Sequence, residues 1–524
     1  MSASTERKQR QAARAAGTDK KTIAMQEEAK KKAKSKRRYT IAVICAVLFI
    51  ILVLVMNSNL MNTATTALTV GGKSFSPAEV TYNYAGDYYS WANTYGSYAS
   101  IFGLDTSYGL SGLASQECQM TESGEGTWKD YFIEQAESSL QQLVALEKYA
   151  DENGISLDEE EIAEVEESFA SLNDTAKSYG YANANKFLSA NYGKGVTVAI
   201  AEKMEKLSSL ASKAYNALSD SYEFTDAEIE EYYEANKDDY DTFSYVYCQI
   251  NAETEEVEGE DGEVTEEVTD ATLETAKAAA DAVAEAVKGS ADGSYSEKLA
   301  AALAEAGIDA EPVEQSDYSG SYVYGIYADW LKDTSRETGD VTVCENSGNT
   351  GYYVVIFIDR GDNNYNLANV RHILIEAEAD ENGEYTEEAL AAAKAKAEEI
   401  LAEWEAGDAN EESFAELAET YSEDSGSNTN GGLYENVEKG SMVEEFNDFC
   451  FAPDRKAGDT GIVYGNNGSY AGYHVMYYSG DGDLARTSIA KSDMTSEKVS
   501  AWLTENAEAQ EVIEKAFFNL VGKI

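Results

Sequence analysis

The chain has 524 residues but only two histidines, His372 and His474, and five cysteines. No cysteines show the close paired spacing of a zinc site, and two histidines offer few further ligands. The composition therefore argues against a metal centre, and we expect no cofactor. The cysteines beyond residue 57 are expected to be buried as small apolar residues; a disulfide between Cys248 and Cys344 is the alternative. These cysteines are Cys118, Cys248, Cys344 and Cys450.

Basic residues are scarce beyond residue 38. The first 38 residues carry 13 Lys and Arg against 4 Asp and Glu, whereas the rest of the chain carries 27 against 92, a net charge of −65. This excess of negative charge excludes nucleic acid as a partner. It favours high solubility, and it would attract cationic clients or calcium. An acidic surface or calcium-binding stalk is therefore a structural alternative to a catalytic or chaperone function.

An uncharged apolar segment, "YTIAVICAVLFIILVLVM", joins the basic tail at 1–38 to the acidic remainder. At a rise of about 1.5 Å per residue, its roughly 18 residues just cross a hydrocarbon layer of about 30 Å. We therefore expect a transmembrane helix at 39–57, with the basic tail inside and the remainder outside the cell membrane. A cleavable signal peptide is the alternative.

Helix-start motifs follow this segment. A Ser or Thr precedes a Glu by three residues at Ser76, Ser156 and Thr225, which is the pattern of a capping box. We expect a mostly helical domain at 68–240 that begins with a short hairpin turning at Gly71–Gly72. Its aromatic-rich segment, "YNYAGDYYSWANTYGSYASIF", predicts packing between helices, with the holding of extended apolar peptides as the alternative.

Three blocks of the chain then occur twice in the same order. "YVYCQINAE" (245–253), "YADWLKDTSRETGD" (327–340) and "GYYVVIFIDRGD" (351–362) match "VRHILIEAE" (370–378), "FNDFCFAPDRKAGD" (446–459) and "GYHVMYYSGDGD" (472–483). We interpret them as two copies of one domain, at 241–361 and 366–482. In this alignment Tyr247 takes the place of His372, and Tyr353 takes the place of His474.

Secondary structure within and after the copies follows from local patterns. The second copy is predicted as strand, long helix (386–404), short helix, turn, helix and two strands. The acidic insert of the first copy, 253–270, predicts a mobile loop. The segment 495–524 predicts a last helix, within a C-terminal part (483–524) that packs on the helical region because its apolar end needs a partner surface.

Both histidines lie in predicted strands of the second copy. A histidine in an apolar strand is more often a buried core residue than a catalytic one, but two that are both absent from the first copy favour a shared site. Between them, "YSEDSGSNTNGG" places Asp424 on a turn. "YENVEKGSMVEEF" adds Tyr434, Met442 and Phe446, an aromatic and thioether set that suits a small apolar ring.

The motifs "VRHILI", "FAELAETYSEDSGSNTNGG", "GSMVEEF" and "GYHVM", in this order, resemble the parvulin-type peptidyl-prolyl isomerases. The resemblance implies that His372, Asp424 and His474 form the catalytic core and that Tyr434, Met442 and Phe446 line the proline pocket. Parvulins usually have leucine at the position of Tyr434. They often also have a hydroxyl residue shortly before the last histidine, where "YAGYH" offers only Tyr470.

With the helical region and two copies, the whole chain resembles the extracytoplasmic PrsA and SurA foldase-chaperones. The expected fold class is α+β, with a single transmembrane helix, a helical chaperone-like domain, a degenerate and an intact parvulin domain, and a C-terminal helix. The resemblance implies prolyl isomerisation of exported, incompletely folded proteins, without metal or cofactor. A non-catalytic chaperone that holds unfolded chains is the alternative, and a homodimer is left open.

Overall fold

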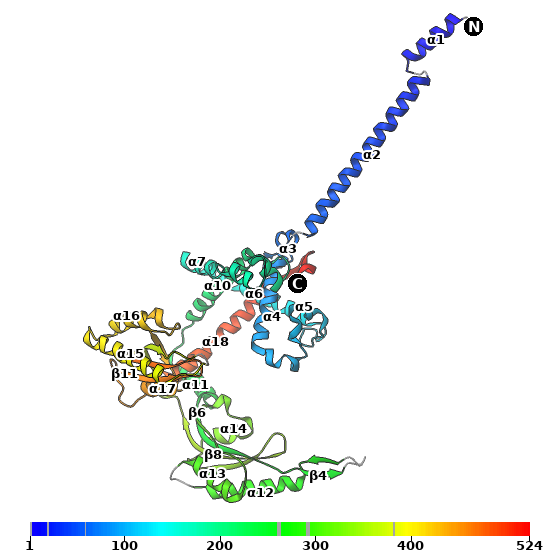
Figure 1. Cartoon of the computed structure of the whole chain (residues 1–524). Coiled ribbons are helices and arrows are strands. Elements are labelled where there is room, and N and C mark those ends of the chain that lie inside the picture. Colours follow the sequence, from blue (N-terminus) through cyan, green and yellow to red (C-terminus); the bar gives the residue numbers. More distant parts are fainter. Residues whose placement is uncertain are drawn as a thin grey trace. The chain divides into compact units, whose positions relative to one another are not determined.

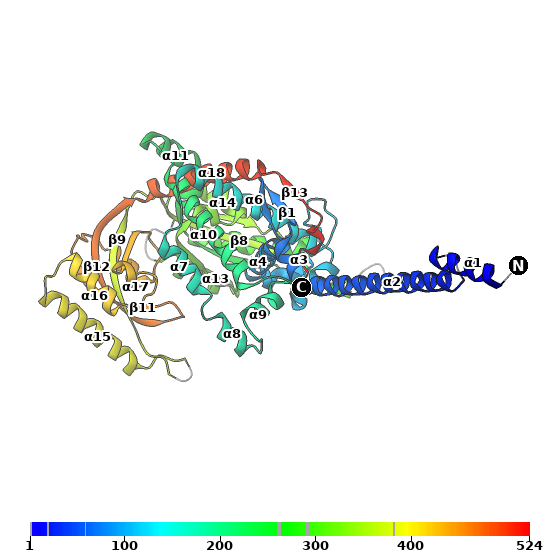
Figure 2. The ribbon, with the colours of Figure 1, turned by 90° about the horizontal axis from the view of Figure 1, so that it is seen from above.

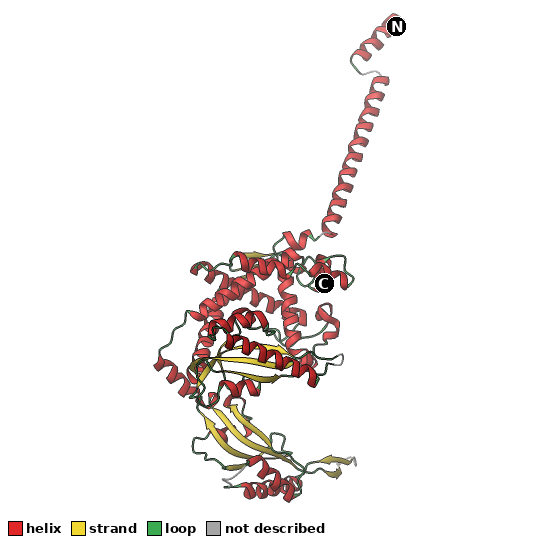
Figure 3. Cartoon of the chain, turned by 60° about the vertical axis from the view of Figure 1, so that its left-hand side comes forward, coloured by secondary structure: helices red, strands yellow, loops and turns green. Residues whose placement is uncertain are grey.

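The computed structural model of the chain describes residues 3–17, 20–57, 59–258, 264–289, 294–380 and 383–523 (Figure 1). The chain divides into two compact units, one formed by Met1–Tyr222 with Glu497–Ile524 and the other by Glu223–Ser496. Colouring by secondary structure shows that the chain combines helices and strands (Figure 3). All sheet pairings are antiparallel, so the α+β part of the expected fold class agrees with the structure.

The transmembrane helix in the predicted fold class is wrong. Among the described residues, no helix is both long and apolar enough to cross a membrane. The segment Tyr39–Met56 belongs to α2 (Lys20–Asn57), a single helix whose first half consists of the strongly charged residues before Tyr39. The side chains of residues 51–57 lie outside the described part of the chain.

The first unit is built mainly from helices, and α4, α6 and α10 form its centre. Trp128 and Phe132 of α6 are fully buried and pack against Tyr84 and Tyr88 of α4. The aromatic-rich segment thus supplies helix packing, as predicted. The helices of this unit after α2 are α3 (Leu60–Ala64), α4 (Pro77–Tyr95), α5 (Gly109–Gly112), α6 (Trp128–Asn153), α7 (Glu159–Ser168), α8 (Leu172–Ser178), α9 (Ala184–Asn191) and α10 (Val198–Asp220); α1 (Ala3–Ala15) and α2 precede them.

Two of the three predicted capping boxes are present. Ser76 caps α4 and Thr225 caps α11 (Asp226–Tyr240), each with the predicted Glu returning a hydrogen bond. At α7 the prediction is wrong, because Asp158 caps the helix in place of Ser156. The Asp158 carboxylate accepts from two backbone N–H groups at once, Glu160 and Glu161, which a single Ser hydroxyl does less well.

A three-stranded sheet in the first unit joins distant parts of the chain. The predicted hairpin forms from β1 (Leu68–Val70) and β2 (Lys73–Phe75), and β13 (Val512–Glu514) pairs with the other edge of β1. The predicted last helix is therefore only partly correct: α18 (Ala485–Glu508) ends early because the following residues complete this sheet. Within α18, the ring of Trp502 lies 5.3 Å from that of Tyr149.

The second unit contains two four-stranded sheets. The first has the order β6-β3-β8-β7, formed by β3 (Thr242–Asn251), β6 (Val313–Ser319), β7 (Val341–Glu345) and β8 (Gly351–Gly361). The helices α12 (Asp270–Val287) and α13 (Tyr295–Ala306) pack on one face, and α14 (Gly325–Lys332) packs on the other. The acidic insert was predicted as a loop, but its flanks pair as β4 (Glu255–Glu258) and β5 (Val264–Glu267); residues 259–263 lie outside the described residues.

The second sheet has the equivalent order, β10-β9-β12-β11. Helices α15 (Glu387–Ala406) and α16 (Glu411–Tyr421) cover one face, as Figure 2 shows, and α17 (Glu444–Cys450) packs on the other. Its strands are β9 (Asn366–Glu376), β10 (Leu433–Val437), β11 (Thr460–Asn466) and β12 (Ala471–Leu484). The prediction missed β10, whose five residues include an exposed Glu435 and Asn436 and show little strand pattern. The domain boundaries drawn from the repeat stay predictions.

All five cysteines are free thiols. Cys248 is buried against α12, whereas Cys344 packs against the cluster on the opposite face of the same sheet. The alternative of a disulfide between them is therefore wrong, because a sheet separates the two sulfurs. Cys118 and Cys450 are buried as expected.

Phe414 of α16 tests the packing of the second sheet. It is fully buried against Trp404 and Tyr477, so Phe414→Ala is expected to lower the free energy of unfolding by about 3–5 kcal/mol. Hydrogen exchange of the β9 and β12 amides in the full chain measures this sheet alone. The exposed Glu419→Ala in the same helix is the matched control, with an expected change below about 0.5 kcal/mol. Equal effects of the two variants would contradict the packing.

Candidate active site

Strand pairing places the two histidines side by side. In the β9–β12 ladder His372 lies opposite Met476 and His474 lies opposite Leu374. The histidines are therefore diagonal neighbours on one face of the sheet, a distance that ring side chains can span. Their ring centroids are 5.2 Å apart, and both side chains are buried. The structure thus brings together two predicted residues that are far apart in the sequence.

A chain of hydrogen bonds runs through these rings. The distances are 2.9 Å from Tyr470 Oη to His474 Nε2, 3.0 Å between the two Nδ1 atoms, and 2.8 Å from His372 Nε2 to Asp424 Oδ2. With both rings neutral, one direction satisfies every contact: Tyr470 donates to His474, His474 donates to His372, and His372 donates to the carboxylate. The carboxylate can only accept, so it sets the tautomers of both histidines.

Asp424 is the acceptor on which four donors converge. Oδ2 accepts from Ser427 Oγ at 2.5 Å and Tyr434 Oη at 3.0 Å, in addition to His372, while Oδ1 accepts from the Gly426 N–H at 3.1 Å. The hydrogen bond from His372, followed by those from Ser427 and Gly426, holds the pKa of Asp424 well below its usual range. Asp424 is therefore a carboxylate at neutral pH.

Burial keeps two other groups of the network uncharged, whereas hydrogen bonds keep Asp424 charged. It lowers the pKa of His474 to about 3, with a further contribution from the neighbouring His372. It also raises the pKa of Tyr434 to about 12, reinforced by the hydrogen bond to Asp424. His474 and Tyr434 are therefore neutral at physiological pH, and Asp424 supplies the negative charge.

Aromatic and thioether side chains form an apolar wall next to the network. The ring of Phe446 stands edge-on to both histidines, with centroid distances of 5.5 Å and 5.4 Å. The ring of Tyr434 lies 5.2 Å from that of His372. Met442 packs on the same buried cluster as Phe446. All six predicted site residues thus lie around one face of the second sheet, and their individual roles stay predictions.

Two glycines allow the turn to approach β9. Gly431 and Gly432 both adopt positive φ, 72° and 71°, a conformation that favours glycine. A Cβ on Gly432 would lie 2.2 Å from the carbonyl oxygen of His372. The backbone N–H of His372 donates to Gly432 O at 2.9 Å, so the glycine pair attaches the turn that carries Asp424 to the strand that carries His372.

Two residues of the network were missed as site residues in the sequence. Ser427 lies three positions after Asp424 and donates to its carboxylate; this spacing in a turn was the available signal. Tyr470 was noted only as the nearest hydroxyl before His474, and the structure shows that it provides the hydrogen bond to that histidine. Tyr434, which stands where leucine is usual, also places its hydroxyl on Asp424.

Comparison with known proteins agrees with this geometry. Residues 352–476 match the family of PPIC-type PPIase domains, a range that contains all six predicted site residues. Foldase protein PrsA 1 of Listeria innocua is 30% identical over 152 residues, which are 27% of this chain and 44% of the relative; the values for Listeria monocytogenes are the same. The chain thus spans less than half the length of these curated relatives.

Solved structures of PrsA foldases also match. The protein from Streptococcus pneumoniae is 13% identical over 77% of this chain and 99% of its own, with a TM-score of 0.22. The peptidylprolyl isomerase PrsA of Bacillus anthracis is 22% identical over 28% of this chain and 59% of its own, with a TM-score of 0.18. Residues 352–476 are thus similar to PPIC-type PPIase domains, and part of the chain is similar to PrsA foldases.

The buried neutral His474 makes the stability of this sheet depend on pH. Its pKa of about 3 in the folded chain lies below the value of about 6.5 in an unfolded chain. The unfolded state therefore binds the extra proton as the pH falls through 6.5, and stability is lost below that pH. Between pH 7 and 5.5 this single group is expected to cost about 1 kcal/mol.

The measurement is hydrogen exchange of β9 amides at both pH values, in the wild-type chain and in His474→Gln. The variant lacks the titrating ring and should lose about 1 kcal/mol less than the wild type over this interval. An equal loss in both chains would show that His474 is not buried in its neutral form.

Proposed function

We propose that the chain is a peptidyl-prolyl cis-trans isomerase and chaperone, with the isomerase site on the second sheet. The observation that carries the proposal is the hydrogen-bonded series Tyr470–His474–His372–Asp424 beside the apolar wall of Phe446 and Met442. The family match over residues 352–476 supports it. His372, Asp424 and His474 are proposed as the catalytic core, and Tyr434, Met442 and Phe446 as the proline pocket.

The reaction needs selective stabilisation of a twisted amide. Rotation about the peptide bond faces a barrier of about 18–20 kcal/mol because twisting removes the conjugation between nitrogen and carbonyl. An enzyme lowers this barrier by binding the twisted form more tightly than either planar form. The apolar wall seats the proline ring, while the polar network stabilises the altered charge of the amide without making a covalent bond.

Within that scheme, the residues have separate tasks. Asp424 supplies a fixed negative charge, because its neighbours keep its pKa low. The two histidines orient this carboxylate and one another through their hydrogen bonds, so their contribution is positioning rather than proton transfer. The hydroxyl of Tyr434 donates to the carboxylate while the residue packs on the cluster that contains Phe446, so a substrate carbonyl in the pocket can compete for this hydroxyl.

The first copy lacks these groups at the equivalent positions. The rings of Tyr247 and Tyr353 form the same diagonal pair, with centroids 6.1 Å apart, but among the described residues no carboxylate bonds to either tyrosine. In this copy β6 is the counterpart of β10, and the short segment 307–312 before it replaces the longer glycine-rich turn. We propose that the first copy is a degenerate, non-catalytic parvulin domain.

An isomerisation assay on the full chain tests the site. A proline peptide should change isomer faster with the wild-type chain, and Asp424→Asn should reduce this acceleration at least tenfold because the fixed charge is removed. The double variant Tyr247→Phe and Tyr353→Phe changes the equivalent pair of the first copy and should keep the activity. No acceleration by the folded wild-type chain would refute the proposed reaction.

Exposed apolar side chains in the first unit support a second function, the binding of unfolded chains without catalysis. Large apolar side chains are exposed on one short stretch of the first unit, between the end of α4 and residue 108. Their exposed fractions reach 77% for Ile101 and 58% for Tyr98. Exposed apolar groups gathered in this way typically mark binding surfaces. The stretch comprises Tyr95, Tyr98, Ile101, Phe102 and Tyr108.

Aggregation of a heat-unfolded reporter enzyme tests this surface. The double variant Tyr98→Asp and Ile101→Asp is expected to suppress aggregation at least threefold less well than the wild type, because it places charge on the surface that contacts apolar clients. Tyr179→Asp, which changes an equally exposed ring of the same unit, should behave as the wild type. Unchanged suppression by the double variant would exclude this stretch as the holding surface.

The clients that we propose are exported proteins that have not finished folding and that contain X-Pro bonds. The resemblance to PrsA and SurA foldases supports this client class and a location outside the cytoplasm. The net charge of −65 beyond residue 38 favours clients with basic segments over nucleic acid. A homodimer stays a prediction.

A further inference from the structure

One edge of the first sheet is open where the same edge of the second sheet is closed. In the first sheet β3 pairs with β8 along its whole length, to Asn251, but its other neighbour, β6, pairs only as far as Tyr247. The last residues of β3 therefore have one neighbour strand instead of two. An unpaired edge of this kind is a template for pairing with another chain.

The direction of the free backbone groups follows from the ladder. Ala252 N–H donates to Thr350 O, so in antiparallel pairing Ile250 and Cys248 also bond to β8. The backbone N–H and C=O groups of Gln249 and Asn251 then point to the open side. No described residue bonds to them: Gln249 and Asn251 bond to each other only through their side chains, at 2.8 Å.

The second sheet shows how these groups are satisfied when the edge is closed. The repeat places Leu374 at the position of Gln249 and Glu376 at that of Asn251. Leu374 N–H donates to Ser422 Oγ, Leu374 O accepts from the Glu423 N–H, and Glu376 N–H donates to the Glu423 carboxylate. The segment that makes these bonds links α16 to the turn carrying Asp424. In the first copy α13 takes the place of α16, but the segment that follows it, 307–312, is shorter and makes no hydrogen bond to Gln249 or Asn251.

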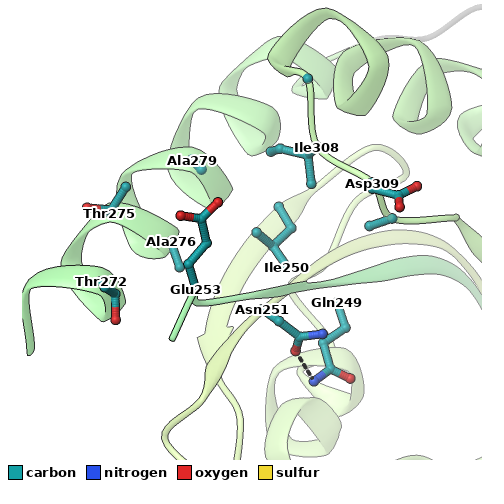
Figure 4. Close-up of a pocket in the computed structure, with 12 residues that line it drawn as sticks. Gln249, Ile250, Asn251, Glu253, Thr272, Thr275, Ala276, Ala279, Ile308 and Asp309 are labelled. Atoms are coloured by element: carbon teal, nitrogen blue, oxygen red, sulfur yellow. Dashed lines mark hydrogen bonds between the residues drawn. The ribbon is translucent and has the colours of Figure 1, made fainter. Parts of the chain in front are cut away.

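A hollow of about 450 Å³ lies beside the open edge in the first copy (Figure 4). The side chains of Ile250 and Ile308 point into it from opposite sides, and Ala276 and Ala279 of α12 form its wall. This hollow is on the face of the sheet covered by α12 and α13, whereas the tyrosines that replace the histidines lie on the face covered by α14. It is therefore separate from the position equivalent to the isomerase site.

The rim of the hollow is acidic. The carboxylates of Glu253 and Asp309 are exposed at its border, and the described lining residues include no Lys or Arg. A bound segment that carries basic side chains next to an apolar one would match this arrangement. An extended polypeptide has alternating backbone donors and acceptors along its edge and side chains on each face. It can therefore bond to the free backbone groups of β3 and place an apolar side chain in the hollow.

We propose that the edge Gln249–Asn251 binds an extended segment of an unfolded polypeptide by β-strand addition. The segment forms hydrogen bonds with the free backbone groups of Gln249 and Asn251. Its residue opposite Ile250 is apolar and enters the hollow, and its flanking residues are basic. The first copy has thereby exchanged the catalytic turn for a second client-binding site. This site does not depend on isomerase activity.

A proline-free peptide separates this site from the isomerase. The probe is acetyl-Lys-Val-Lys-Val-Lys-Val-Lys-amide with a fluorescent label, titrated with the full chain. When the central valine of the probe lies opposite Ile250, the N–H groups of its third and fifth residues face the edge, whereas those of its second and fourth residues face away. N-methylation of the third and fifth residues should weaken binding at least tenfold, and N-methylation of the second and fourth should change it less than threefold.

A proline substitution in β3 tests whether the probe binds at the edge Gln249–Asn251. Asn251→Pro removes an N–H that points to the open side and leaves the bonds to β8 intact, so it should weaken probe binding at least tenfold. Asn251→Ala is the matched control and should bind as the wild type, with unfolding of both variants checked by hydrogen exchange of β8. Equal binding of the two methylated probes, equal binding of the two variants, or no binding at millimolar probe would overturn the proposal.

Discussion

The register of β12 against β9 is the constraint on which the site depends. Side chains alternate between the two faces of a strand, so a slip of one residue would move one histidine to the face covered by α15 and α16. In the observed register, His372 and His474 share a face, and the rings meet diagonally. Gly472 secures this register, because a Cβ there would lie 2.3 Å from the carbonyl oxygen of Ile375 on the neighbouring strand.

Once the histidines are paired, their burial makes a charged partner necessary. Two buried imidazoles that bond through their Nδ1 atoms leave both Nε2 atoms to be satisfied, and unpaired buried polar groups are costly. Asp424 satisfies one Nε2 atom as an acceptor and Tyr470 satisfies the other as a donor. The carboxylate in turn requires donors, which Ser427, Tyr434 and the Gly426 N–H provide. The network is therefore closed within one sheet, the turn that carries Asp424 and the turn before β12 that carries Tyr470.

The parts of this arrangement differ in how far the sequence reveals them. The histidines, Asp424 and the aromatic wall were identified because they depart from local pattern and lie in motifs with a fixed order. Ser427 and Tyr470 were missed as site residues because their role depends on where a turn points the hydroxyl, which strand periodicity does not encode. The pairing of β13 with β1 was missed for a related reason: three residues cannot show a pattern, and their partner is over 400 positions away. The transmembrane helix was predicted from hydropathy alone, which does not show that the apolar residues continue a charged helix.

The two four-stranded sheets have equivalent strand orders but differ at one edge. In the second copy the segment after α16 has two tasks: it places Asp424 under His372, and it pairs the outer backbone groups of Leu374 and Glu376. In the first copy the shorter segment after α13, 307–312, does neither, so the missing carboxylate and the open edge have one structural cause. The tyrosines at the positions of the histidines in the first copy pack on neighbouring rings and have no bonded carboxylate among the described residues. The open edge has no such internal substitute in the described part of the first copy, and a bound strand would supply both a donor and an acceptor at every second residue.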